Sequence, residues 1–78
     1  MISGVVVASS PKHLAMVSEA VEAFAWANVF YSDPAGRLVV TVEADGVDDS
    51  IERLELLGRL PNVLSASLAE YWLEEDEV

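Results

Sequence analysis

The chain has 78 residues, enough for one domain with a single hydrophobic core, and 53% of them are hydrophobic, which excludes an intrinsically disordered chain. The absence of cysteine excludes disulfides and thiolate metal sites. Fourteen acidic residues against four basic ones give a net charge of −10, so we expect no nucleic acid partner and favour a cationic one.

The opening residues, MISGVVVASS, carry no positive charge and only a short apolar run. They match neither a secretory signal peptide nor a transmembrane span. A cytoplasmic protein without stable membrane insertion is therefore expected.

The first half of the chain predicts a strand, a helix and a second strand. Residues 2–8 are rich in valine, as strands are, and Ser10 with Pro11 can begin a helix. Helical spacing relates the next apolar residues, which are Leu14, Val17, Val21 and Phe24. Residues 27–32 then predict a strand in which Val29 and Tyr31 face one way and Asn28, Phe30 and Ser32 the other.

A hairpin turn and a third strand follow. Asp33 suits the first turn position, Pro34 fixes φ, and Gly36 tolerates a positive φ. Residues 37–43 alternate, with Leu38, Val40 and Val42 on one side and Arg37, Val39, Thr41 and Glu43 on the other.

The second half predicts a helix and a last strand. Asp48 or Asp49 can cap the helix, and Leu56 lies off its apolar stripe. The stripe consists of Val47, Ile51, Leu54 and Leu57. Pro61 and Asn62 end this helix, and Asn62 can adopt a left-handed conformation. Residues 63–71 predict the last strand, so the domain is expected to span 1–73, with an acidic tail at 74–78.

The predicted order, β-α-β-β-α-β, indicates an α+β ferredoxin-like fold of the split β-α-β type. Right-handed crossovers place both helices on one face of a four-stranded antiparallel sheet. The other face then has no covering layer. We expect Ser3, Val5 and Val7 under the helices. On the open face we expect Ile2, Gly4, Val6, Asn28, Phe30, Ser32, Val39, Thr41, Glu43, Ser65, Ser67 and Ala69.

This mixture of apolar and small polar side chains favours a surface for a partner, and a strand glycine such as Gly4 often marks close approach of another backbone. No catalytic, metal or cofactor site is predicted. His13, the only histidine, has no second ligand at helical spacing, and no phosphate-binding motif occurs.

Three stretches, ISGVVVASSPKHLAMV, SDPAGRLVVTVEAD and LPNVLSASLAEYW, resemble the NapD family. The resemblance covers residues 2–72. It implies a cytoplasmic chaperone, not an enzyme, that binds the twin-arginine (Tat) signal peptide of the catalytic subunit of the periplasmic nitrate reductase. The resemblance also implies that the peptide binds as a helix on the sheet and that this binding delays export until the molybdenum cofactor is inserted. Ala25 and Trp26 depart from the turn residues usual in the family, and Asn62 replaces a usual glycine.

On this hypothesis the apolar side of the peptide contacts Ile2, Val6, Phe30, Val39 and Thr41, while Glu43 is the first candidate to meet an arginine. Two alternatives share the element order. One is a small-molecule-binding regulatory domain of the ACT type, although SSP after the first strand offers no glycine-bearing ligand loop. The other is a module that forms a weak homodimer through the sheet.

Overall fold

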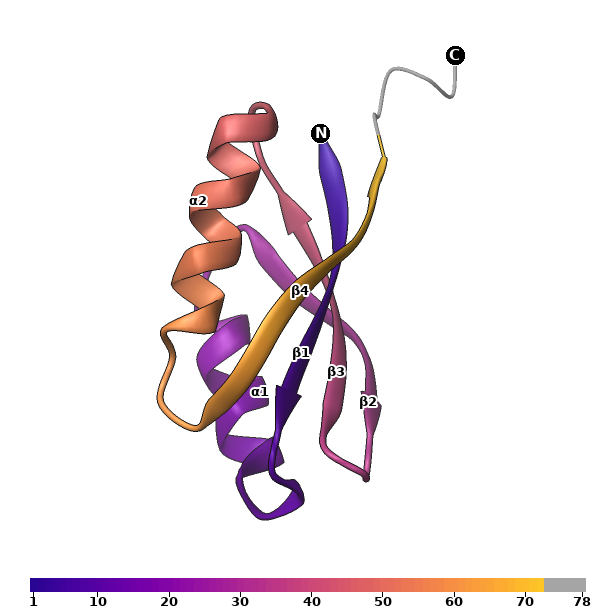
Figure 1. Ribbon diagram of the computed structural model, residues 1–78, viewed down its shortest axis with the longest axis vertical. Helices are drawn as coiled ribbons and strands as arrows, with labels where there is room; N and C mark the ends of the chain where they lie inside the picture. The colour runs from indigo at the N-terminus through magenta and orange to yellow at the C-terminus, as the bar shows by residue number, and fades with distance from the viewer. Residues whose placement is uncertain (73–78) are drawn as a thin grey trace.

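Four strands form one antiparallel sheet in the order β2-β3-β1-β4, and both helices lie on the same side of it (Figure 1). This computed structural model describes residues 1–72, with side chains through Ala69. The elements are β1 (Ile2–Ser9), the 3-10 helix η1 (Pro11–His13), α1 (Leu14–Glu22), β2 (Ala27–Asp33), β3 (Arg37–Glu43), α2 (Val47–Gly58) and β4 (Val63–Trp72). The predicted α+β ferredoxin-like fold is confirmed.

The core lies between the sheet and the two helices. Its fully buried side chains come from alternate strand positions and from one side of each helix: Val5, Val7, Val17, Val21, Leu38, Val40, Val42 and Leu57. Strand alternation places successive side chains on opposite faces, so the inner set of β3 is the one that the sequence predicts. The other face of the sheet has no helix over it (Figure 1).

The apolar stripe predicted for α2 is partly wrong. Val47 and Ile51 are 50% and 44% exposed, whereas Ser50 is buried. The Ser50 hydroxyl lies 3.1 Å from that of Ser3 on β1, so the two satisfy each other inside the protein. The helix is therefore docked with Ser50 and Leu57 toward the sheet, and Leu56 is exposed as expected.

The helix starts also differ from prediction. Gly46, not Asp48 or Asp49, occupies the cap position of α2, and no side chain caps the helix. The Asp49 carboxylate instead accepts a hydrogen bond from the Asp45 N–H at 3.0 Å. At the first helix start, Ser10 precedes η1, and its hydroxyl lies 2.9 Å from Nδ1 of His13.

Gly36 and Asn62 both adopt the positive φ that the sequence predicts for them. Gly36 has φ +114°, and the Ala35 N–H donates to the Asp33 carboxylate at 2.9 Å, which closes the β2–β3 turn. Asn62 has φ +71° between α2 and β4. The predicted tail, residues 74–78, lies outside the described residues. In the part of the chain that is described, no helix combines the length and apolar character needed to span a membrane.

Candidate binding surface on the open face of the sheet

Cross-strand register defines the face of the sheet that the helices leave open. Val6 lies between Val39 of β3 and Ser67 of β4, and Gly4 lies opposite Thr41. Ile2 lies opposite Glu43 in the same way. Because directly opposed residues project to the same side, the register confirms the open-face placement of Ile2, Gly4, Val6, Asn28, Val39, Thr41, Glu43, Ser65 and Ser67.

The register of β2 reverses the predicted sides of Tyr31 and Ser32. Phe30 is an extra residue, so that Tyr31, not Phe30, lies opposite Val39. Ser32 then lies opposite Leu38, a core residue, and not on the open face as predicted. Tyr31 takes its place there, contrary to the simple alternation. Phe30 and Tyr31 are 74% and 57% exposed.

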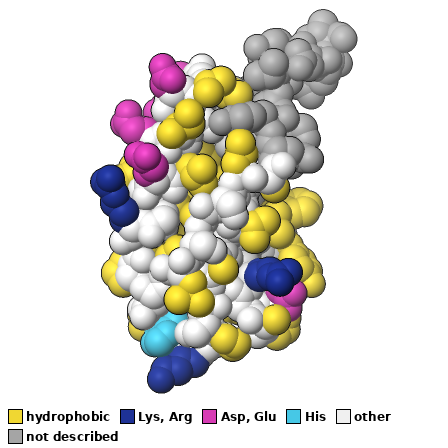
Figure 2. All heavy atoms as spheres, in the orientation of Figure 1, with side chains coloured by type: hydrophobic (Ala, Val, Ile, Leu, Met, Phe, Trp, Pro, Cys, Tyr) yellow, Lys and Arg dark blue, Asp and Glu magenta, His cyan; other side chains and the backbone are white. Residues whose placement is uncertain are grey.

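The surface is apolar beside β2 and shallow at its centre. Ile2, Val6 and Val39 are half-buried among their neighbours, and none belongs to the core between sheet and helices. Hydrophobic side chains are visible along the strands at the right of Figure 2. Gly4 contributes no side chain, and the Thr41 hydroxyl turns to the Asn28 carbonyl at 3.4 Å. A partner can therefore approach the central backbone closely while contacting flanking apolar groups.

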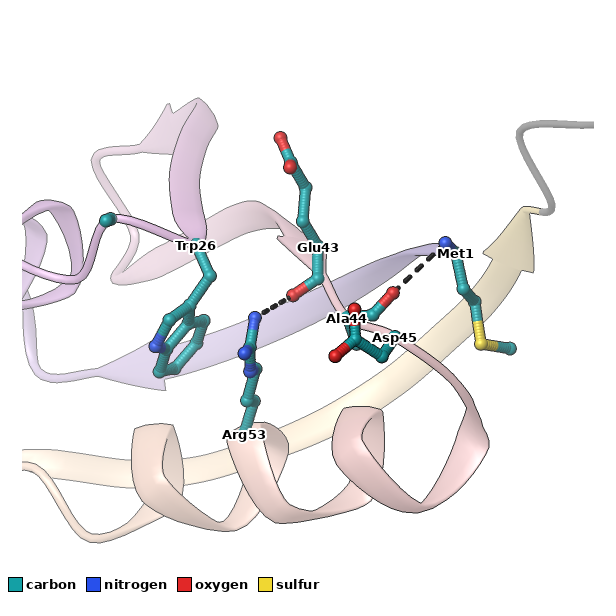
Figure 3. Close-up of a pocket in the computed structure, with 7 residues that line it drawn as sticks. Met1, Trp26, Glu43, Ala44, Asp45 and Arg53 are labelled. Carbon is teal, nitrogen blue, oxygen red and sulfur yellow. Dashed lines mark hydrogen bonds between the residues drawn. The ribbon is translucent and has the colours of Figure 1, made fainter.

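Glu43 combines a fixed backbone with a free carboxylate. Its N–H donates to the Trp26 carbonyl at 2.8 Å, and its carbonyl accepts a hydrogen bond from Arg53. The side chain points to the other side of the strand, away from α2 (Figure 3). Within the described residues this carboxylate makes no ion pair, because Arg53 pairs with Asp49 at 3.3 Å. Glu43 thus presents an uncompensated negative charge at the end of the open face.

Trp26 and Arg53 form a contact that is not predicted from the sequence. The guanidinium carbon lies 5.2 Å from the ring centroid of Trp26, and this ring stacks on Phe24 at 4.5 Å. A cation–π contact between residues 27 positions apart leaves no periodic pattern in the sequence. The sequence singled out Ala25 and Trp26 only as a departure from the turn residues usual in the family. The contact ties the start of β2 to α2 and holds the Glu43 backbone.

An open hollow of about 510 Å³ lies beside this contact (Figure 3). The residues that line it are Met1, Ala25, Trp26, Glu43, Ala44, Asp45 and Arg53. Both of its cations already have partners: Arg53 contacts Asp49 and Trp26, and the Met1 ammonium donates to the Ala44 carbonyl at 3.1 Å. Residues 1–69 also contain no group of three histidine, aspartate or glutamate side chains that could hold a metal ion. The open face therefore remains the best candidate site.

The fold and this surface belong to one class: a small ferredoxin-like α+β domain whose sheet has both helices on one face and leaves the other face open. Within that class the chain belongs to the NapD family, because the family model described as "NapD protein" matches residues 1–71. The chain is also similar to the solution structure of the E. coli Tat proofreading chaperone protein NapD. The TM-score is 0.84 and the identity 30%, over 96% of this chain and 80% of that one. A search of curated proteins found no match.

Proposed function

We propose that this protein is a chaperone of the cytoplasm that binds the Tat signal peptide of the periplasmic nitrate reductase catalytic subunit. The peptide lies on the open face of the sheet, and the protein acts by binding, without catalysis. Occupation of the signal peptide delays export until the cofactor is inserted. The observation that carries the proposal is the apolar open face ending in the Glu43 carboxylate, which has no ion-pair partner among the described residues, in a chain of the NapD family.

Signal peptides of this kind are chemically complementary to the open face. Their basic region precedes an apolar stretch. The apolar stretch matches Ile2, Val6, Val39 and the two aromatic residues of β2, and an arginine matches Glu43. Exposed ion pairs contribute about 0.2–1 kcal/mol each, whereas apolar burial contributes about 25 cal/mol per Å². Apolar contact therefore supplies most of the affinity, and the charges supply selectivity and a faster encounter.

The decisive experiment is Val39→Asp, measured by calorimetric titration with the cognate signal peptide. A carboxylate at the centre of the apolar surface should abolish binding, while the half-buried position should let the fold persist, as circular dichroism would show. Val47→Asp is the matched control, because this exposed residue begins α2, where an acidic residue is tolerated. Unchanged binding by the Val39→Asp variant would rule out the open face.

The same preparation tests the alternatives. Free amino acids should give no heat on titration, whereas a domain of the ACT type would bind one. The peptide-bound protein should have the mass in solution of one chain with one peptide, because a dimer closed through the open face would compete with the peptide.

A further inference from the structure

The two ends of the open face carry opposite charge. In β3 the open-face row begins at Arg37 and ends at Glu43, and both are exposed. Six residue steps of about 3.3 Å separate them by roughly 20 Å. Any partner lying along the strands therefore meets a cation at one end and a carboxylate at the other.

Neighbouring elements strengthen the negative end. Asp45 and Asp48 come two and five residues after Glu43, and both are exposed, while the charge of Asp49 is paired with Arg53. The Met1 ammonium, which donates to the Ala44 carbonyl at 3.1 Å, offsets one of the three remaining acids, so the described residues give this end a local charge of about −2. In Figure 2 acidic side chains gather near the top of the view, around the start of α2. Trp72 lies opposite Ile2, so β4 also ends here.

The opposite end is weakly basic. The Ser9 N–H donates to the Gly36 carbonyl at 2.7 Å, so η1, which contains the exposed Lys12, begins at the same end of the sheet as Arg37. Asp33 lies opposite Arg37 and offsets one of the two cations, leaving a local charge of about +1. Basic side chains lie near the bottom of the view in Figure 2.

From this polarity we infer the direction of the bound peptide. The signal peptide lies as a helix along the strands, with its basic N-terminal part beside Glu43 and the end of its apolar stretch beside Arg37. The inference rests on the proposed function. A helix of about 13 residues spans the 20 Å, at 1.5 Å per residue.

Two effects favour this direction over its reverse. The twin arginines precede the apolar stretch, so the reverse direction would place them beside Arg37 and Lys12. The helix macrodipole is positive at its N-terminus and negative at its C-terminus, so it adds to the preference of the side-chain charges.

Paramagnetic relaxation tests the direction. Because the chain has no cysteine, a nitroxide can be confined to a single cysteine of the peptide, placed either before the arginine pair or after the apolar stretch. The full chain, labelled with ¹⁵N, reports the broadening, and the reduced nitroxide is the control. The N-terminal label should broaden the amides of Glu43 and Ala44, and the C-terminal label those of Gly36 and Arg37.

Each other outcome has a definite meaning. The inverse pattern, or equal broadening at both ends from either label, overturns the inferred direction while leaving the open face as the site. Broadening confined to α1 and α2, or no binding at all, overturns the proposed function and the direction with it.

A charge exchange gives an independent test. Arg37→Glu combined with Glu43→Lys keeps the net charge at −10 but reverses the polarity of the open face. We expect peptide affinity to fall about three- to tenfold, the scale of one or two exposed ion pairs. The matched control, Glu55→Lys with Arg59→Glu, makes the same exchange at exposed positions of the α2 segment and should change affinity less than twofold. Equal effects of the two exchanges would overturn the inference.

Discussion

Tyr31 of β2 lies directly opposite Val39 of β3, on the face of the sheet that no helix covers. Simple alternation would place Tyr31 with Val29, toward the helices. The extra residue at Phe30 reverses this for the second half of β2, because a bulge sets two residues against one. The open face therefore ends in two adjacent, exposed aromatic side chains beside a half-buried valine.

Tyr31→Ala should lower peptide affinity at least tenfold, because an aromatic side chain at an interface buries a large apolar area. Ser32→Ala is the matched control one residue along β2. Since Ser32 lies opposite a core residue, its substitution should change affinity less than twofold. Isothermal titration calorimetry with the signal peptide measures both. A larger loss from Ser32→Ala than from Tyr31→Ala would contradict the bulged register.

Salt should slow peptide association. The Debye length falls from about 10 Å at 0.1 M to about 3 Å at 1 M, which screens the attraction between a basic peptide and a chain of net charge −10. Stopped-flow fluorescence should show the association rate falling with salt while the dissociation rate changes little. A peptide with both arginines replaced by glutamine should lose most of this dependence. An association rate indifferent to salt would remove electrostatics from the recognition.

Gly36→Ala should lower the free energy of unfolding by about 2–4 kcal/mol. The residue has φ +114°, and an added Cβ would lie 2.1 Å from the Ser9 carbonyl oxygen, so the hairpin and the end of β1 would have to separate. Gly46→Ala is the control, because a Cβ there meets nothing within 4 Å. Urea denaturation followed by circular dichroism gives both values. Equal costs for the two variants would show that the close approach at Gly36 is unimportant.

The buried hydroxyl pair of Ser3 and Ser50 should behave non-additively. Ser3→Ala or Ser50→Ala alone leaves one buried hydroxyl without its partner and should cost about 1–3 kcal/mol of unfolding free energy. The double variant removes both groups and should be more stable than either single variant. A double-mutant cycle in urea measures the coupling, and strictly additive losses would show that the hydroxyls do not stabilise each other.

The fold and most of the candidate surface can be predicted from the order of the amino acids alone. Alternation in β3 identified Val39, Thr41 and Glu43, and turn chemistry identified Gly36 and Asn62. These features depend on local backbone geometry. Strands and helices have periods of 2.0 and 3.6 residues, and the order of apolar and polar side chains follows these periods. With two helices for four strands, and both crossovers right-handed, one face of the sheet had to stay open.

The side chains that complete that surface depend on how distant segments pack in the folded protein. The bulge at Phe30 depends on how β2 pairs with β3, and it exchanged Ser32 for Tyr31. The rotation of α2 that buries Ser50 follows from its partner Ser3 in another element. The cation–π contact of Arg53 likewise joins two distant segments. Each of these depends on contacts between residues far apart in the chain, and such contacts have no fixed spacing in the sequence.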